Sequence, residues 1–270
     1  EPGDQRAAPR LRATQSQAWY SARTAHFDVY VHRSALPVGD RVVALVEGVH
    51  EEVTSTWGWE PHRRTTVVVD DGTDGANGSA TVTPWPTIRV NAAPPGFDES
   101  LGHFDDWMRL LLVHEYTHIV HIGRAGGLPR AANFLVGLGV YPNGGVPRWW
   151  IEGLAVLAES AAADEGRLHS PLFTAWIRAA ALDGDLARLG QLSGAPLDWP
   201  QATAWYLYGA WYVQHLADEA GWDAIRRMVD RLGRQVLPLP LNRLGRQELG
   251  LGIVREWPTF LAGVSGEAAA

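Results

Sequence analysis

The chain has 270 residues, of which 46% are hydrophobic, enough to bury a sizeable core in one large or two small packed units. All 23 basic residues are Arg, and the formal net charge is −7 with no basic block, so the composition does not favour nucleic-acid binding. Cys is absent, which excludes disulfides and thiolate metal sites and leaves His, Asp and Glu as metal ligands. No apolar run approaches the roughly 18–20 residues that span a membrane.

The first part of the chain carries strand signals. Residues 1–18 are polar and rich in Arg, Ala and Gln, and a loose leader is expected at 1–20. Between Asp40, a plausible N-cap, and Gly58, an apolar stripe at helical spacing predicts a helix. Alternating or β-branched runs predict strands at 26–31, 65–69 and 87–91, and a Gly/Asp-rich loop is expected at 70–78.

From Leu101 onward the apolar period becomes helical, and Gly123 is expected to end the first and strongest of these helices. The Gly/Pro-rich segment that follows is expected to be a long connection with a short helix near 130–138. Further helices are predicted at about 148–163, 171–182, 202–219, 222–232 and 253–262. Strands first and helices later indicate an α+β fold, with a sheet lobe at about 21–100 and a mainly helical lobe at about 101–265.

The strongest chemical motif is His114-Glu115-Tyr116-Thr117-His118, of the form H-E-x-x-H, inside the first strong helical pattern. Residues i and i+4 share one helical face, so both imidazoles can reach one ion. Zn²⁺ accepts His nitrogens and keeps a water position open in catalytic sites. Glu115, one residue on, is placed to act as the general base toward that water. The alternative is a set of polar residues on a solvated helix face.

Two imidazoles do not complete a catalytic zinc site, so a third ligand is needed. His121, at i+7 from His114, would lie about 7–8 Å along the helix axis from the midpoint of the pair, too far for direct ligation. It is therefore expected to support the site indirectly or to be exposed. Glu152, at the start of the next strong helix, would complete a His₂Glu set, and Gly153 would let the two helices approach closely. The alternative role for Glu152 is an acid favoured by the helix dipole.

The motif pair resembles a known group. H-E-x-x-H followed by Trp149-Trp150-Ile151-Glu152-Gly153-Leu154-Ala155 is similar to the gluzincin peptidases, in which a W-x-x-E-G-x-A segment follows the zinc motif. More closely, the chain resembles the peptidase MA-like domain that precedes TolB/WD40-like β-propeller repeats in large bacterial exported proteins. Less specific sequence matches to this domain fall at residues 25–30, 69–71, 76–78, 105–107, 147–149, 170–173, 206–209 and 241–243.

The resemblance implies a single metallopeptidase domain at 21–265, with a small mixed sheet that has an antiparallel edge strand, beside a helical lobe with thermolysin-like active-site helices. It implies that the strand before the active-site helix, Thr87 to Asn91, pairs with an extended peptide substrate, unless it is an ordinary structural edge strand. It also places Tyr206 as the donor of a hydrogen bond to the developing oxyanion. Alternatively, Tyr206, Tyr208 and Tyr212 form an aromatic core stripe.

Two departures from the family pattern stand out. The gap between His118 and Glu152 has 33 intervening residues, longer than in thermolysin or the aminopeptidases, so the segment 123–147 is expected to cover or narrow the cleft. The amine-binding Gly-x-Met-x-Asn segment of the aminopeptidases is absent. An endopeptidase is therefore expected rather than an aminopeptidase.

The sequence thus predicts a peptidase with one Zn²⁺ per chain, held by His114, His118 and Glu152, with Glu115 and Tyr206 as catalytic groups. Its partners would be a peptide or protein substrate and, by the resemblance alone, a β-propeller in the full-length protein; the resemblance also implies export to the periplasm or the medium. The alternative is a catalytically weak or inactive module that binds zinc and peptide beside a propeller. A purely structural metal is a third interpretation, against which the intact Glu115 argues.

Other polar residues are expected to play no part in this chemistry. Glu159 could orient a zinc-bound His, but a solvated acid is the simpler interpretation. His169 lies between two predicted helices after the motif. The remaining histidines are scattered, and each is expected to be a surface residue or a hydrogen-bonded core residue rather than a ligand: His26, His32, His50, His62, His103 and His215.

Overall fold

A computed structural model describes most of the chain, namely residues 11–13, 18–73, 75–96, 101–137, 139–161, 166–194, 196, 198–236 and 241–269. The expected leader at 1–20 lies largely outside the described residues. The chain divides into two compact units, residues 1–119 and 120–270. The first unit carries the sheet, and every element described in the second is helical.

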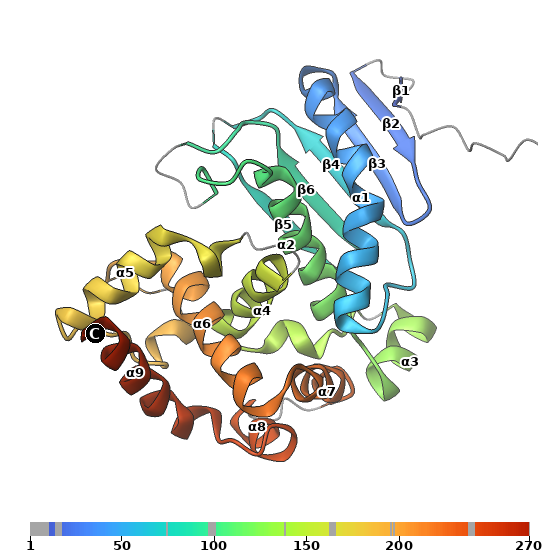
Figure 1. The fold of residues 1–270 in the computed structure, drawn as a ribbon. Helices are drawn as coiled ribbons and strands as arrows, with labels where there is room; N and C mark the ends of the chain where they lie inside the picture. Colours follow the sequence, from blue (N-terminus) through green and yellow to red (C-terminus); the bar gives the residue numbers. More distant parts are fainter. Residues whose placement is uncertain are drawn as a thin grey trace, which may run out of the picture. The chain divides into compact units, whose positions relative to one another are not determined.

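The first unit is built on a mixed sheet (Figure 1). Its described strands are β1 (Arg12–Ala13), β2 (Trp19–Arg23), β3 (Phe27–His32), β4 (Thr65–Asp70), β5 (Gly78–Thr81) and β6 (Thr87–Asn91). They lie in the order β1-β2-β3-β4-β6-β5. The central pairs β3–β4 and β4–β6 are parallel, and the pairs toward both edges are antiparallel. The expected α+β class, with a mixed sheet and an antiparallel edge, is confirmed.

Side chains alternate along the central strands, and the buried set is apolar. In β3, Phe27, Val29 and Val31 are buried, whereas Tyr30 is exposed. Helix α1 (Leu36–Trp57) lies across the sheet (Figure 1) and meets β3 closely: a Cβ added to Gly39 would come within 2.4 Å of Val31 Cγ1. The β-branched interior of the sheet therefore forms one core with the apolar stripe of α1.

Helix α2 (Trp107–Ile122) carries the H-E-x-x-H motif and joins this core. The ring of Tyr116 lies 5.1 Å from that of Phe27 on β3. The helix begins several residues after Leu101, where its periodic pattern starts, and its last turn ends just before Gly123 as expected. Its final residues belong to the second unit.

The edge strand differs from the expectation. Thr87–Asn91 pairs with β4 on one side and with β5 on the other, so it is an interior strand with no edge to offer a peptide. The prediction that it binds substrate by strand addition is therefore wrong. Residues 78–81, of which Gly78 was expected to end a loop, instead form β5, and β5 has no strand partner on its outer side among the described residues.

The second unit is helical, and α4 and α6 form its centre (Figure 1). Its described helices are α3 (Gly127–Val136), α4 (Arg148–Ala161), α5 (Pro171–Leu182), α6 (Thr203–Ala220), α7 (Trp222–Leu232), α8 (Leu241–Glu248) and α9 (Ile253–Ala269). Aromatic rings fill its core: Tyr212 on α6 lies 5.4 Å from Trp149, 4.8 Å from Trp257 and 5.2 Å from Phe260, centroid to centroid. Such tilted and edge-on contacts are the preferred geometries of aromatic pairs.

Close packing of α4 on α6 depends on two glycines. A Cβ added to Gly153 would lie 2.4 Å from the carbonyl oxygen of Gly209, and one added to Gly209 would lie 2.3 Å from that of Trp149. The sequence predicts that Gly153 lets α4 approach the helix of the H-E-x-x-H motif, whereas the close contact that this glycine makes is with Gly209 on α6.

No helix in the described ranges is both long enough and apolar enough to be a membrane-crossing candidate.

Candidate metal centre

Helix α2 brings two imidazoles together. His114 and His118, one turn apart, are both buried, and their rings meet edge to face with centroids 4.7 Å apart. The two Nε2 atoms are 3.1 Å apart. Two ligands of a tetrahedral zinc ion at about 2.0–2.1 Å would be separated by about 3.3 Å, so the pair fits one ion without a change of backbone. The same separation lets one ring donate a hydrogen bond to the other in the metal-free chain.

Glu115 lies against the end of β5. It is buried, and a Cβ added to Gly78 would come within 2.8 Å of Glu115 Oε1. Only a glycine lets this strand approach the carboxylate so closely. This contact was not predicted from the sequence, because β5 is short and follows a Gly-rich segment.

Glu152 lies on α4 and is also buried. Its Oε1 is 3.1 Å from a guanidinium nitrogen of Arg148, whose side chain is half exposed. Every residue of α4 from Trp149 to Ser160 is buried. Burial of an ionised carboxylate requires compensation by charge or by hydrogen bonds, and Arg148 places a positive charge beside it.

Glu159 differs from its prediction. It was expected to be solvated, but it is fully buried, and Arg167 donates to it from Nε at 2.8 Å and from a terminal nitrogen at 2.7 Å. Burial lowers the pKa of Arg167, but Glu159, followed by Tyr206 and Glu152, outweighs burial and raises it. Arg167 therefore stays charged and lies among these three side chains of the second unit. The apolar periodicity of α4 could not predict the pairing of Glu159 with Arg167, because Arg167 lies beyond the end of the helix.

The three tyrosines of α6 differ in their environment. Tyr206 is half-buried, and Arg167 lies over its ring at 4.9 Å from the centroid. Tyr208 is buried and accepts a hydrogen bond from the Ala187 amide at 3.4 Å. Tyr212 is buried and donates to the Ile253 carbonyl. The aromatic core role is therefore filled by Tyr208 and Tyr212.

Two further histidines can be placed. His121 is fully buried, so the exposed alternative for it is wrong. His169, in the short 3₁₀ segment Arg167–His169, is exposed.

No protein-family model matches the sequence, and a search of the curated proteins gave no match. Among solved structures, the chain is similar to a mutant of a two-domain M1 zinc metallopeptidase bound to L-arginine, with 14% sequence identity and a TM-score of 0.48. The match covers 95% of this chain and 51% of that chain, so this sequence spans about half the length of that protein.

Proposed function

We propose that this protein is a zinc-dependent peptidase in which His114, His118 and Glu152 hold the metal. The observation that carries the proposal is the 3.1 Å separation of two buried imidazole nitrogens that flank Glu115 on one helix. The three side chains could hold a metal ion as a group. Two neutral imidazoles and one carboxylate are a donor set that suits Zn²⁺.

A zinc ion held by these residues would polarise a peptide carbonyl and lower the pKa of water toward about 7. Glu115 then accepts the proton of the attacking water and passes it to the leaving amine. Its burial supports this role, because a carboxylate shielded from bulk water keeps the proton for the leaving group. Arg148, which pairs with Glu152, orients that carboxylate.

Tyr206 is proposed as the donor to the developing oxyanion. Tyr206 is half-buried on α6, and the charged guanidinium of Arg167 lies over its ring at 4.9 Å from the centroid. A hydroxyl aimed at charge that appears only in the transition state accelerates the reaction without strengthening substrate binding.

For the substrate, β5 replaces the strand expected from the sequence. Its outer side, which no other described strand pairs with, can accept an extended peptide by β-augmentation, and its Gly78 end lies against Glu115. A peptide paired there would carry its carbonyl groups past the general base. This supports cleavage within a chain, and we propose an endopeptidase. Export and a neighbouring β-propeller are also proposed, on the sequence resemblance alone.

The decisive variant is Glu115→Gln, which removes the base but keeps the shape of the side chain. We expect full zinc content, measured by plasma mass spectrometry, and a loss of peptide hydrolysis of about 10²- to 10⁴-fold. Peptides with an acetylated N-terminus should be cleaved by the wild type, as an endopeptidase requires.

The matched control is Glu219→Gln, at an exposed position of α6, which should keep wild-type activity. Equal activity of Glu115→Gln and the wild type would refute the role of Glu115. Tight peptide binding without turnover in the zinc-loaded wild type would replace the peptidase with a peptide-binding module.

A further inference from the structure

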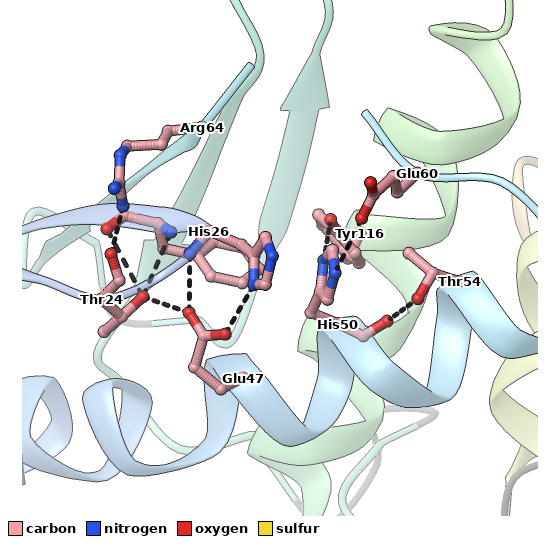
Figure 2. Close-up of polar contacts among 9 residues, drawn as sticks. Thr24, His26, Glu47, His50, Thr54, Glu60, Arg64 and Tyr116 are labelled. Atoms are coloured by element: carbon pink, nitrogen blue, oxygen red, sulfur yellow. Dashed lines mark hydrogen bonds and ion pairs between the residues drawn. The ribbon is translucent and has the colours of Figure 1, made fainter. Parts of the chain in front are cut away.

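Two histidines of the first unit, distant in the sequence, lie in contact (Figure 2). His26 precedes β3 and His50 lies on α1, and their rings are stacked with centroids 3.6 Å apart and planes 6° apart. Glu60, just after α1, places Oε2 3.6 Å from His50 Nε2. One donor atom from each of the three residues lies within 4.8 Å of the others.

Both imidazoles are held through the same ring nitrogen. His26 Nδ1 is 2.7 Å from Glu47 Oε2, and the His26 amide donates to Glu47 Oε1 at 2.8 Å. His50 Nδ1 is 2.7 Å from the hydroxyl of Tyr116 (Figure 2). Each ring therefore has Nε2 as its second nitrogen for ligation. Metal-binding histidines are characteristically oriented in this way, by a carboxylate or another polar group on the opposite ring nitrogen.

We propose that His26, His50 and Glu60 form a second zinc-binding site, separate from the H-E-x-x-H motif, with Glu47 and Tyr116 orienting the two imidazoles. Two nitrogen donors and one carboxylate suit Zn²⁺, whereas Ca²⁺ and Mg²⁺ prefer sites made of oxygen. The site lies wholly within the first unit.

The charges around the site favour a cation. Burial, followed by the nearby His26, lowers the pKa of His50, while Glu47, Glu60 and Glu51 oppose part of this effect. Burial raises the pKa of Glu47, but hydrogen bonds from Thr24 and His26 outweigh it and lower that pKa. The Glu47 carboxylate lies beside His26, one of the proposed ligands.

Ion binding requires a local rearrangement. The lone pair of an imidazole nitrogen lies in the plane of its ring, so the lone pairs of two stacked rings lie in parallel planes and do not converge on one point. One of the two rings must therefore turn before both can bind the same ion. The side chains of His26 and Glu60 are 42% and 65% exposed, whereas that of His50 is 7% exposed. His50 is the fixed ligand, and the other two can move around it.

The test is a count of bound zinc on the full chain by isothermal titration calorimetry and metal analysis. The wild type should bind two equivalents, and His26→Ala and Glu60→Gln should each lose one equivalent or weaken it by about tenfold or more. His62→Ala, an exposed histidine outside both ligand sets, is the matched control and should keep two. Mg²⁺ should not compete.

This count separates the new site from the proposed peptidase centre. His114→Ala should lose the other equivalent and keep the one that depends on His26. A single equivalent that is lost in His114→Ala and kept in His26→Ala would overturn the second site and leave the peptidase proposal standing. A single equivalent lost only in His26→Ala would support the second site and refute the zinc ligands on α2.

A measurement on the wild type avoids any effect of the variants on folding. In an NMR titration with Zn²⁺, the imidazole resonances of His26 and His50 should shift together at the second equivalent. Unchanged resonances of both rings at saturating zinc would overturn the proposal.

Discussion

A buried ion pair lies inside the second unit. The carboxylate of Glu159 is fully buried, and Arg167 contacts it through two guanidinium nitrogens and its own backbone amide. Such a pair contributes little net stability compared with apolar side chains of the same size, but either charge left alone in the interior is costly. The pair also fixes Arg167 over the ring of Tyr206, the proposed oxyanion donor.

Glu159→Gln leaves Arg167 charged without its buried counter-ion. We expect the free energy of unfolding to fall by about 3–5 kcal/mol, measured by urea denaturation followed by circular dichroism. The control is Asp223→Asn, which breaks the ion pair between Asp223 and Arg226. The Asp223 side chain is 72% exposed, so the free energy of unfolding should change little. Equal stability of Glu159→Gln and the wild type would contradict the structural role assigned to this pair.

At the scale of elements, the contact between α4 and α6 places the Glu152 helix. The glycines at the crossing, Gly153 and Gly209, bring each backbone against the other, and no side chain fits between them. Glu152 is next to Gly153 in the chain, so the position of its carboxylate depends on this crossing.

Gly153→Ala should therefore destabilise the protein although alanine is the better helix former. The added methyl group would lie 2.4 Å from the Gly209 carbonyl oxygen, and relief of this overlap is expected to cost about 1–3 kcal/mol. Gly263→Ala on α9 is the matched control, because that position is exposed with open space around it. This control should gain about 0.5–1 kcal/mol from helix propensity. The melting temperatures of both variants, compared with that of the wild type, test these two expectations. A higher melting temperature for Gly153→Ala would show that α4 and α6 do not cross closely at this glycine.

At the scale of the whole molecule, the two units have cores of different composition. β-branched residues form most of the first core, whereas Leu and Ala are the commonest buried residues of the second, which also buries Trp149, Trp150 and Trp257. A metal held by side chains of the folded chain stabilises the folded state, because the unfolded chain does not preserve the ligand geometry.

Removal of zinc should accordingly lower the melting temperature. Zinc at about 1,000 times its dissociation constant adds about 4 kcal/mol to the free energy of unfolding, and a chelator should abolish this gain. Scanning calorimetry of the zinc-loaded and chelator-treated protein measures the difference. Glu152→Ala should reduce the shift, whereas Glu219→Ala should not. An identical melting temperature with and without zinc would argue against any metal in the folded chain.

Local periodicity in the sequence determined most of the helical lobe. The predicted helices at 171–182 and 222–232 match the observed bounds of α5 and α7, because an apolar stripe and its end signals lie within each segment. The H-E-x-x-H spacing likewise predicted that His114 and His118 share a face, since i and i+4 neighbours are set by the helix itself. Helix α8 was missed because Leu244 and Gly245 are its only residues described as buried, too few to give a pattern.

Features that depend on partners distant in the sequence were decided by the tertiary structure. The sequence could not show that β5 takes the edge of the sheet, because strand pairing is set by contacts between segments rather than within them. The burial of Glu159 against Arg167 and the stacking of His26 on His50 were hidden for the same reason. A sequence records which side chains share a turn of helix, but the folded chain decides which carboxylates and imidazoles from different elements lie close enough to share a proton or an ion.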